Sequence, residues 1–573
     1  MTEPRKIERE AGRRVDRPLA RLPLPRLLLA LLPLAFLLLF YFYPVVSILA
    51  TSLAPQGQFD LAPFSRLFSG TQYLEILWFT LWQAALSTLL TVLLGLPGAY
   101  VFARYTFPGK SILRALTTVP FVLPTVVVAT AFTALLGGRG RLNLALMALL
   151  GLDQPPIDLR GTLGAILLAH VFYNTTLVMR IVGTYWTNLD PALPEAARML
   201  GASRWRAFRE VTLPLLAPAL GAAALLTFIF CFTSFGVVLI LGAGRYATLE
   251  VEIFYRTVYL ADLPLAAALA LIQIVLTFGL MWAYTRLQAR VAAPEQLRSA
   301  QVTQRQPRSA REWLLVVASV GPALVLLLTP LASLVERSLT VGAGGLGSYR
   351  TVLAGADDSI LAVPPLMAVR NSLLFALGAT LLALVLGGVA SIVIANRGRR
   401  RSFLSRLLDP LLMLPLGTSA VTLGLGYIVA LDEPPLNLRT SPALVVLAHA
   451  LVALPFVVRS VLPALRSINP ALRESAAMLG ASPWQVWREI DLPIVARAVG
   501  VGAVFAFTVS MGEFGATALI YRPQFLTMPI AIYRLLGRPG VANYGQALAM
   551  STLLMLVCVA GFVGIERFRV ETF

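Results

Sequence analysis

One segment of this chain occurs twice. It reads PALPEAARMLGASRWRAFREVTLP at 191–214 and PALRESAAMLGASPWQVWREIDLP at 470–493. The copies align without a gap, and the second begins 279 residues after the first. Each copy is polar and lies between long apolar stretches. A polar segment repeated at the same place in two hydrophobic halves indicates a duplicated membrane protein, with the repeated loop on the same aqueous side in both halves.

The apolar stretches are long enough to cross a bilayer. The chain has 573 residues, of which 58% are hydrophobic and 13% are charged, and a soluble protein could not bury so much apolar surface. A hydrocarbon core about 30 Å thick needs roughly 20 apolar helical residues, and lipid offers no hydrogen-bond partners to an open strand. We therefore predict an all-α integral membrane protein with about twelve transmembrane helices, at 27–50, 78–103, 113–136, 161–184, 213–242, 263–285, 313–335, 371–395, 407–431, 441–463, 493–521 and 545–565.

The positive charges are unevenly distributed along the chain. The formal net charge is +19, which alone would be compatible with binding to nucleic acid. Lys and Arg are concentrated, however, in the N-terminal head at 5–17 and in the cluster at 397–401. With the N-terminus in the cytoplasm, both clusters lie on the cytoplasmic side, as the positive-inside rule requires. We expect these charges to face anionic membrane lipid and not nucleic acid, and both termini to be cytoplasmic.

The chain divides into two similar halves. We expect a basic cytoplasmic tail at 1–26, a first repeat of six spans at 27–288, a cytoplasmic linker at 289–312 and a second repeat of six spans at 313–573. Because six is even, both halves enter and leave on the same side, and the repeats are parallel. The match is gap-free from about 168 to 270, where His170 pairs with His449, and it needs an offset near 291 further upstream, where Pro124 pairs with Pro415. Two pseudo-symmetric halves with a pathway between them are the expected architecture.

The repeated loop has the local signals of short helices. Pro191 and Pro470 suit a helix start, and the following acidic residues suit its first turns. Gly201 and Gly480 suit a left-handed helix end. We expect two short helices to lie across the cytoplasmic face before Pro214 and Pro493 begin the next spans. An ordinary interfacial helix anchored by Trp205 and Trp484 would share these features, but it would not need two nearly identical copies.

The repeated loop resembles the EAA loop of ATP-binding-cassette (ABC) importer permeases of type I. That pattern is EAA, three residues, Gly, about nine residues, then I-x-L-P, and the second copy departs from it only by a Ser at the first Ala. The resemblance implies that each loop couples to an ATPase, through Glu195, Ala196, Ala197 and Gly201 in the first half and Glu474, Ser475, Ala476 and Gly480 in the second. It further implies two ATP-binding ABC subunits, an extracytoplasmic substrate-binding protein and a bacterial cytoplasmic (inner) membrane.

The chain lacks the motifs of a motor or an enzyme. A phosphate-binding loop needs G-x-x-x-x-G-K-[ST], and at the single G-K-S, residues 109–111, the first Gly is replaced by Arg104. ATP hydrolysis is therefore expected on a separate subunit. No clustered nucleophile, base or metal-ligand set is present, so we expect no catalytic residue, no cofactor and no metal. Cys231 and Cys558 both fall within spans and are interpreted as packing residues.

The spans that follow the repeated loops are the candidates to line a translocation pathway. Ser234 and Phe235 in the first half correspond to Glu513 and Phe514 in the second. An ionisable group inside a span usually faces a cavity or a partner, so Glu513 could attract a cationic solute or could hold helices together. The equivalent His170 and His449 are the only histidines. They fit an interhelical hydrogen bond better than a metal site, because no carboxylate or thiolate accompanies them in sequence.

The solute is less sharply indicated than the class of transporter. The stretch from Cys231 to Thr257 is similar to the first half of thiamine permeases, and the fused twelve-span format is shared with ferric-iron permeases. Residues 512–520 are similar to a stretch of molybdate and sulfate permeases. The resemblance therefore favours thiamine, with ferric iron next and polyamines, phosphonates and oxyanions as further alternatives. A proton-coupled secondary transporter would also fit twelve spans, but it would not need the paired coupling loops.

Overall fold

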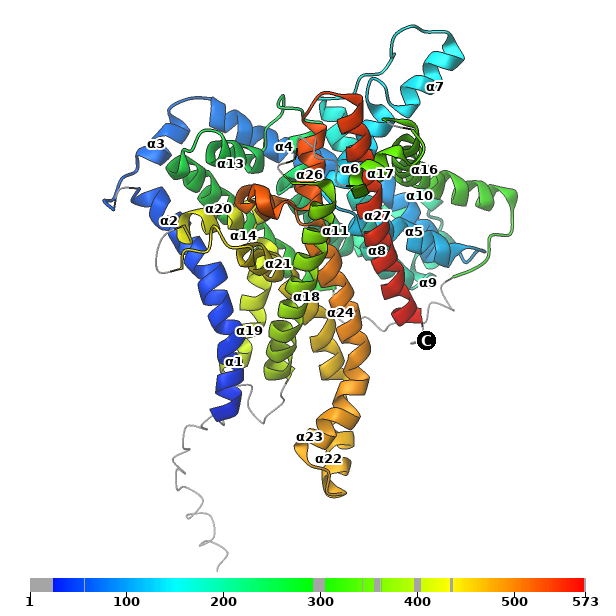
Figure 1. Cartoon of the computed structure of the whole chain (residues 1–573). Helices are drawn as coiled ribbons and strands as arrows, with labels where there is room; N and C mark the ends of the chain where they lie inside the picture. Colours follow the sequence, from blue (N-terminus) through cyan, green and yellow to red (C-terminus); the bar gives the residue numbers. More distant parts are fainter. Residues whose placement is uncertain are drawn as a thin grey trace, which may run out of the picture.

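The computed structural model describes residues 24–570 apart from 56, 292–303, 343, 355–360, 362, 396–402 and 433–435. The predicted basic tail up to residue 23, most of the predicted linker and the Arg397–401 cluster lie outside the described residues. Within the described residues the chain is helical throughout, without a β-sheet (Figure 1). The predicted all-α fold class is confirmed.

Long apolar helices dominate the structure. Among the described residues, ten helices are long and apolar enough to cross a membrane, or up to twelve if each of two bent helix pairs is counted as one span. The bent pairs correspond to the predicted third and ninth spans. The chain bends by 101° between Lys110–Pro120 and Thr125–Leu150, and by 100° between Leu407–Gly417 and Ala420–Ala430. Each of these two predicted spans is therefore bent near its middle.

The helices of the first half precede the linker. They are α1 Leu24–Leu37, the π-helical turn η1 Leu38–Phe42, α2 Tyr43–Leu53, α3 Ala62–Phe68, α4 Gln72–Arg104, α5 Lys110–Val122, α6 Thr125–Leu136, α7 Arg141–Leu150, α8 Leu163–Asn188, α9 Ala192–Met199, α10 Arg204–Ala207, the π-helical turn η2 Phe208–Thr212, α11 Leu213–Phe232, α12 Gly236–Leu241, α13 Leu249–Val258 and α14 Leu263–Val291.

The second half repeats this order with a shorter loop in place of α7. Its helices are α16 Ala310–Thr340, α17 Gly347–Ala354, α18 Pro365–Ala395, α19 Phe403–Met413, the 3-10 turn η3 Leu414–Gly417, α20 Ala420–Ala430, α21 Ala443–Ser467, α22 Pro470–Met478, α23 Pro483–Val486, the π-helical turn η4 Trp487–Asp491, α24 Leu492–Gly512, α25 Gly515–Ile520, the 3-10 turn η5 Pro523–Phe525, α26 Met528–Leu536 and α27 Val541–Val570.

Each half is built around a bundle of three long helices. Helices α4, α8 and α11 pack on one another in the first half, and α18, α21 and α24 do so in the second. One close approach in each bundle uses the same pair of residue types. A Cβ placed on Gly95 would lie 2.9 Å from Cβ of Val178, and one on Gly387 would lie 2.8 Å from Cγ1 of Val457. Small residues of this kind let membrane helices approach closely where apolar burial alone provides little drive.

Adding a methyl group at Gly387 is expected to destabilise the second bundle. Gly387→Ala forces the added carbon against the stiff, β-branched side chain of Val457, and such overpacking costs about 1–3 kcal/mol. The adjacent Gly388 is a matched control, because a Cβ there would meet nothing within 4 Å. Gly388→Ala is expected to be neutral or to stabilise through helix propensity. Thermal unfolding of both variants in detergent tests this, and equal midpoints would contradict the packing argument.

The two halves exchange their first spans. Helices α1 and α2 of the first half pack against α18 and α20 of the second, whereas α16 of the second half packs against α4 and α6 of the first. The hydroxyl of Tyr41 lies 2.8 Å from Oγ1 of Thr418 across this junction. The exchange makes one intramembrane body of the two repeats, because each half covers part of the other's core.

The spans after the repeated loops end earlier than predicted. The predicted spans 213–242 and 493–521 each break in their last third, because α11 ends at Phe232 and α12 begins at Gly236, while α24 ends at Gly512 and α25 begins at Gly515. The register further upstream also differs from the prediction. Helix α6 begins at Thr125 and α20 at Ala420, an offset of 295 and not 291, because η3 places additional residues before the second helix.

Candidate functional site

A cavity lies between the two halves at the helix breaks. Its volume is about 420 Å³, within the range of small-molecule sites. Both halves contribute to its wall: the starts of α6 and α20, the middle of α8, and the breaks after α11 and α24. The lining includes six Phe and Tyr side chains, namely Tyr173, Phe230, Phe235, Phe456, Phe505 and Phe514. The cavity is therefore a mostly apolar, aromatic site at the interface of the repeats.

Two equivalent phenylalanines meet at this interface. The rings of Phe235 and Phe514 stack with their centroids 5.4 Å apart and an interplanar angle of 23°. Both rings are buried. The residue after each phenylalanine is a glycine that starts the next short helix, and a Cβ on Gly236 would lie 3.1 Å from Cδ1 of Phe514. The stacked pair thus joins the two repeats at one wall of the cavity.

In the first half, a buried histidine holds the break in place. Nδ1 of His170 lies 2.9 Å from the hydroxyl of Ser87 on α4, and Nε2 lies 2.8 Å from the hydroxyl of Ser234 in the break. The ring therefore connects three segments of one repeat, namely α4, α8 and the break. This geometry confirms an interhelical hydrogen bond for His170.

In the second half, a carboxylate holds the equivalent break. Oε1 of Glu513 accepts a hydrogen bond from the backbone N–H of Ala516 at 2.8 Å, and Oε2 accepts one from that of Thr517 at 3.0 Å. The Thr517 hydroxyl also donates to Oε2. Glu513 thus satisfies the free N–H groups at the start of α25, where a negative charge is favourable.

His449 completes this second network. Its Nδ1 lies 2.8 Å from the Ser510 hydroxyl, and its Nε2 lies 2.8 Å from the Thr517 hydroxyl and 3.4 Å from Oε2 of Glu513. Since the Thr517 hydroxyl donates to Glu513, it accepts from His449, and Nε2 is the protonated nitrogen. The interhelical role of the histidines therefore holds in both halves.

The structure brings together all four predicted pathway residues. Ser234, Phe235, Glu513 and Phe514 all line the cavity. That Glu513 attracts a cationic solute stays a prediction, although its oxygens already accept hydrogen bonds from α25. Sequence reasoning missed Tyr173, Asn174 and Ser419, which also line the cavity. The bend between α5 and α6, and its counterpart before α20, carry Pro124 and Ser419 into the site.

The two repeated loops form matching structures away from this cavity. Helix α9 follows Pro191, and α22 begins at Pro470 with the Asn469 side chain accepting a hydrogen bond from the Ala471 N–H. The predicted left-handed helix ends are confirmed, with φ of 92° at Gly201 and 86° at Gly480. Figure 1 shows α22 and α23 projecting at the far end of α24, opposite α13, α20 and α26.

The second predicted short helix is not separate from the next span. Helix α10 runs through η2 into α11, and α23 runs through η4 into α24, as single helical segments of 29 and 30 residues. The prediction of two separate helices was wrong because Pro214 and Pro493 occupy the second positions of α11 and α24. Proline has no backbone N–H, and the π-helical turn before each proline accommodates this gap in the hydrogen-bond pattern, so the helix continues.

Each loop presents an unpaired apolar tip. The relative exposure is 89% for Met199, Leu200, Met478 and Leu479 alike. Glu195 and Glu474 are exposed on the same short helices, and among the described residues neither forms an ion pair. Stacked aromatic pairs brace the loops, with centroids 5.6 Å apart for Trp205 and Phe208 and 4.9 Å apart for Trp484 and Trp487. Each tip is an exposed apolar pair beside a carboxylate, a surface suited to a protein partner.

Comparison with protein families matches both halves of the chain. The family described as "Binding-protein-dependent transport system inner membrane component" matches residues 92–293 and residues 383–570. The two matched segments contain the repeated loops and the helix breaks that line the cavity. They cover well over half of the chain.

Several relatives are similar over most of the chain. The thiamine transport system permease protein ThiP of Brucella abortus is 30% identical over 492 residues, covering 84% of this chain and 85% of the relative. ThiP of Salmonella typhimurium is 29% identical over 524 residues, covering 90% of this chain and 91% of the relative. The putative 2-aminoethylphosphonate transport system permease protein PhnU of Salmonella paratyphi A is 32% identical over 271 residues, covering 47% of this chain and 94% of the relative.

Solved structures give a more distant likeness. A bacterial ABC transporter involved in the import of the acidic polysaccharide alginate is 19% identical with a TM-score of 0.39, and covers 46% of this chain and 96% of that chain. The alginate transporter in complex with its alginate pentasaccharide-bound periplasmic protein gives 18% identity and a TM-score of 0.40, covering 47% of this chain and 95% of that chain.

Proposed function

Because this chain belongs to the family of binding-protein-dependent transport system inner membrane components, and is thus the permease of an ABC importer, we propose that the solute it imports is thiamine. The observation that carries this proposal is the likeness to thiamine permeases, which extends over 84% of the chain in a single alignment. The likeness therefore includes both repeats, and these form both walls of the cavity.

The chemistry of the cavity suits an aromatic cation. Phe235, Phe514 and Tyr173 are among the aromatic residues of the lining, and a cation over an aromatic ring gains about 0.5–2 kcal/mol. Glu513 is the one carboxylate among the described residues that line the cavity. We infer that the aromatic faces select a flat organic cation and that Glu513 keeps the local charge negative.

Two other solutes, a phosphonate and ferric iron, each have one observation in their favour. Likeness to a putative 2-aminoethylphosphonate permease over 47% of the chain favours a phosphonate, but an anion would have to pass the Glu513 carboxylate. Ferric iron is the second alternative, because ferric-iron permeases share the fused two-repeat format. A hard cation prefers several charged oxygen ligands, whereas the described lining of the cavity contains one carboxylate and is mainly apolar.

We further propose the partners of the permease. Two copies of an ATP-binding subunit would each receive one coupling loop, through Glu195 and its neighbours in one half and Glu474 and its neighbours in the other. A substrate-binding protein would deliver the solute at the opposite end of the molecule. Residues 27–288 and 313–573 are the proposed repeats, with the termini and residues 289–312 in the cytoplasm.

The solute is tested by ATPase stimulation. The chain is co-expressed with its ATP-binding subunits, purified and reconstituted with its binding protein. Thiamine-loaded binding protein is expected to raise ATP hydrolysis several-fold, whereas the binding protein offered ferric iron or 2-aminoethylphosphonate is expected to leave it at the basal rate. Stimulation by either of the other two solutes, without stimulation by thiamine, would refute the substrate assignment.

The topology is tested by labelling introduced cysteines. Leu149 on α7 and Met199 on α9 are both well exposed, and the proposed topology puts them on opposite sides of the membrane. A membrane-impermeant maleimide is expected to label Leu149→Cys in intact spheroplasts and Met199→Cys only after lysis. The native Cys231 and Cys558 are buried and serve as the unlabelled background. The reverse pattern would place the coupling loops outside the cell.

A further inference from the structure

A second cavity opens at the end of the molecule opposite α22 and α23. Its volume is about 1160 Å³. The first half contributes the ends of α6 and α12 and the loops around α7, and the second half contributes the end of α16 and the loop from α26 to α27. Figure 1 shows α7, α17 and α26 together at this end. The cavity thus lies at the junction of the two repeats, on the proposed extracytoplasmic face.

Arginines gather in this cavity without matching carboxylates. Arg139, Arg160, Arg337 and Arg538 line it, and the only acidic lining residue among those described is Asp153. None of the four guanidinium groups forms an ion pair with a described residue. Nε of Arg337 is buried without a hydrogen-bond partner, which costs free energy unless a ligand supplies an acceptor. At the rim, Arg141 lies 4.0 Å from Glu336.

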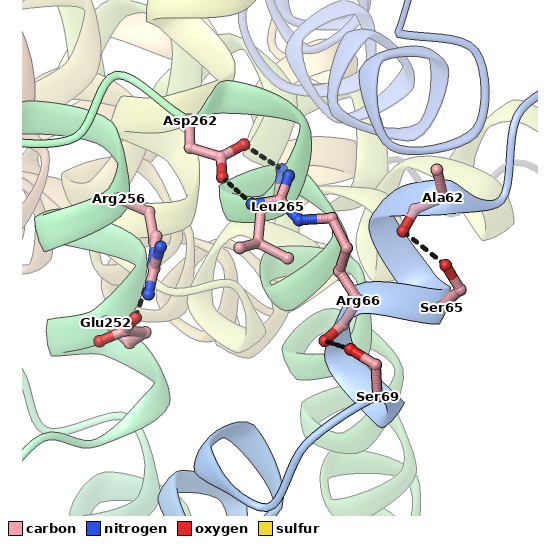
Figure 2. Close-up of polar contacts among 8 residues, drawn as sticks. All are labelled: Ala62, Ser65, Arg66, Ser69, Glu252, Arg256, Asp262 and Leu265. Carbon is pink, nitrogen blue, oxygen red and sulfur yellow. Dashed lines mark hydrogen bonds and ion pairs between the residues drawn. The ribbon is translucent and has the colours of Figure 1, made fainter.

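The pseudo-symmetry-related side of the same face is different. There Arg66 donates to Asp262 at 2.7 Å, and Arg256 donates to Glu252 at 2.7 Å (Figure 2). Asp262 also accepts from the Leu265 N–H at 3.4 Å, which fixes the carboxylate at the start of α14. Arg439 pairs with Asp432 in the loop before α21. Three arginines on this side are therefore neutralised within the chain, while those of the cavity are not.

We propose that the arginine-lined cavity is the docking site for acidic side chains on one lobe of the extracytoplasmic binding protein, and that the charge difference between the two sides fixes the orientation of that partner. The proposal rests on the proposed function, which supplies a binding protein at this face. A permease of two similar halves could otherwise receive a two-lobed partner in either of two orientations. The cavity arginines are unpaired, whereas Arg66, Arg256 and Arg439 on the other side are neutralised. This difference makes one orientation of an acidic lobe more favourable than the other.

The geometry favours a protein partner over lipid. Three of the arginines, Arg139, Arg160 and Arg538, are exposed and line a concave surface that both repeats share. Because the wall includes both Arg160 of the first half and Arg538 of the second, an acidic group bound here bridges the halves. Binding at this site would therefore respond to their relative position, as a delivery site must.

The test is a charge reversal with a matched control. Arg160→Glu with Arg538→Glu reverses one exposed cavity arginine in each half. Arg66→Glu with Arg439→Glu makes the same change in net charge, again one residue per half, on the related side. The reconstituted complex in nanodiscs is titrated with the purified binding protein, and ATP hydrolysis is measured at 50 mM and 500 mM NaCl.

The cavity variant is expected to need about tenfold more binding protein for half-maximal stimulation at low salt, with unchanged basal hydrolysis, and the shift is expected to shrink at high salt. The control variant is expected to stay within about twofold of the wild type. An unshifted cavity variant, or equal shifts in both variants, would overturn the proposal.

Lipid occupancy gives a distinct outcome. If the cavity variant changes only the dependence of basal hydrolysis on the phosphatidylglycerol content of the nanodisc, the site binds a headgroup and the proposal fails. The readout is stimulation by the binding protein carrying whichever solute it retains. A failure of thiamine as the solute would therefore leave this test intact.

Discussion

Replacing the four exposed tip residues of the coupling loops by serine is expected to abolish ATP-driven transport while the permease stays folded. Met199, Leu200, Met478 and Leu479 are each 89% exposed, so the substitutions remove no internal packing. Burial of one such side chain against a partner contributes about 1.5–3 kcal/mol. Loss of all four should weaken assembly with the ATP-binding subunits by several orders of magnitude, as measured by co-purification.

A matched change elsewhere separates coupling from general surface effects. Leu149→Ser with Leu150→Ser alters two exposed apolar residues of α7 at the opposite end of the molecule, and it is expected to leave assembly unchanged. Replacing both Glu195 and Glu474 by lysine is expected to impair assembly with the ATP-binding subunits, as the serine replacement of the four tip residues does. Normal assembly and normal stimulated ATP hydrolysis in the serine variant would remove the loops from the coupling mechanism.

Truncation of Glu513 is expected to cause the second large effect, a near-complete loss of uptake. Glu513→Ala leaves the N–H groups of Ala516 and Thr517 without their acceptors inside a buried break, at a cost of roughly 1–3 kcal/mol per group. The break that shapes the cavity should then lose its fixed geometry. The measurement is uptake into proteoliposomes, alongside the monodispersity of the purified complex.

Two further variants help to interpret this result. Ser234→Ala, at the equivalent position of the first half, removes one contact with His170 and is expected to reduce uptake only a few-fold. Glu513→Gln keeps one acceptor oxygen but removes the charge, so it is expected to impair thiamine more than an uncharged analogue. Wild-type uptake by Glu513→Ala would show that neither the charge nor the helix start at this position matters.

The sequence was sufficient to predict the fold class and the left-handed helix ends in the repeated loops. Span length and hydrophobicity are local properties, so the long helices follow from them directly. The loops around Gly201 and Gly480 were predictable because caps and left-handed ends depend on a few neighbouring residues. The duplication then supplied a second copy, and with it the expectation that Phe235 and Phe514 occupy equivalent positions.

The remaining features depend on contacts between distant segments. The exchange of α1, α2 and α16 between the halves leaves no local signal, since lipid-facing and protein-facing apolar residues look alike in sequence. The breaks at Ser234 and Glu513 were missed because the hydrophobic stretch continues past them. The partners that stabilise these breaks, His170 and His449, lie about 64 residues upstream in each half.

We propose that this chain passes thiamine inward when ATP is hydrolysed on its partners. The most direct measurement is uptake of radiolabelled thiamine into proteoliposomes that contain the complex, with ATP inside and the binding protein outside. The account predicts accumulation above the external concentration, which stops without ATP, stops in the tip variant and is not reduced by excess ferric iron or 2-aminoethylphosphonate. Thiamine uptake that only equilibrates, or that proceeds unchanged without ATP, would contradict it.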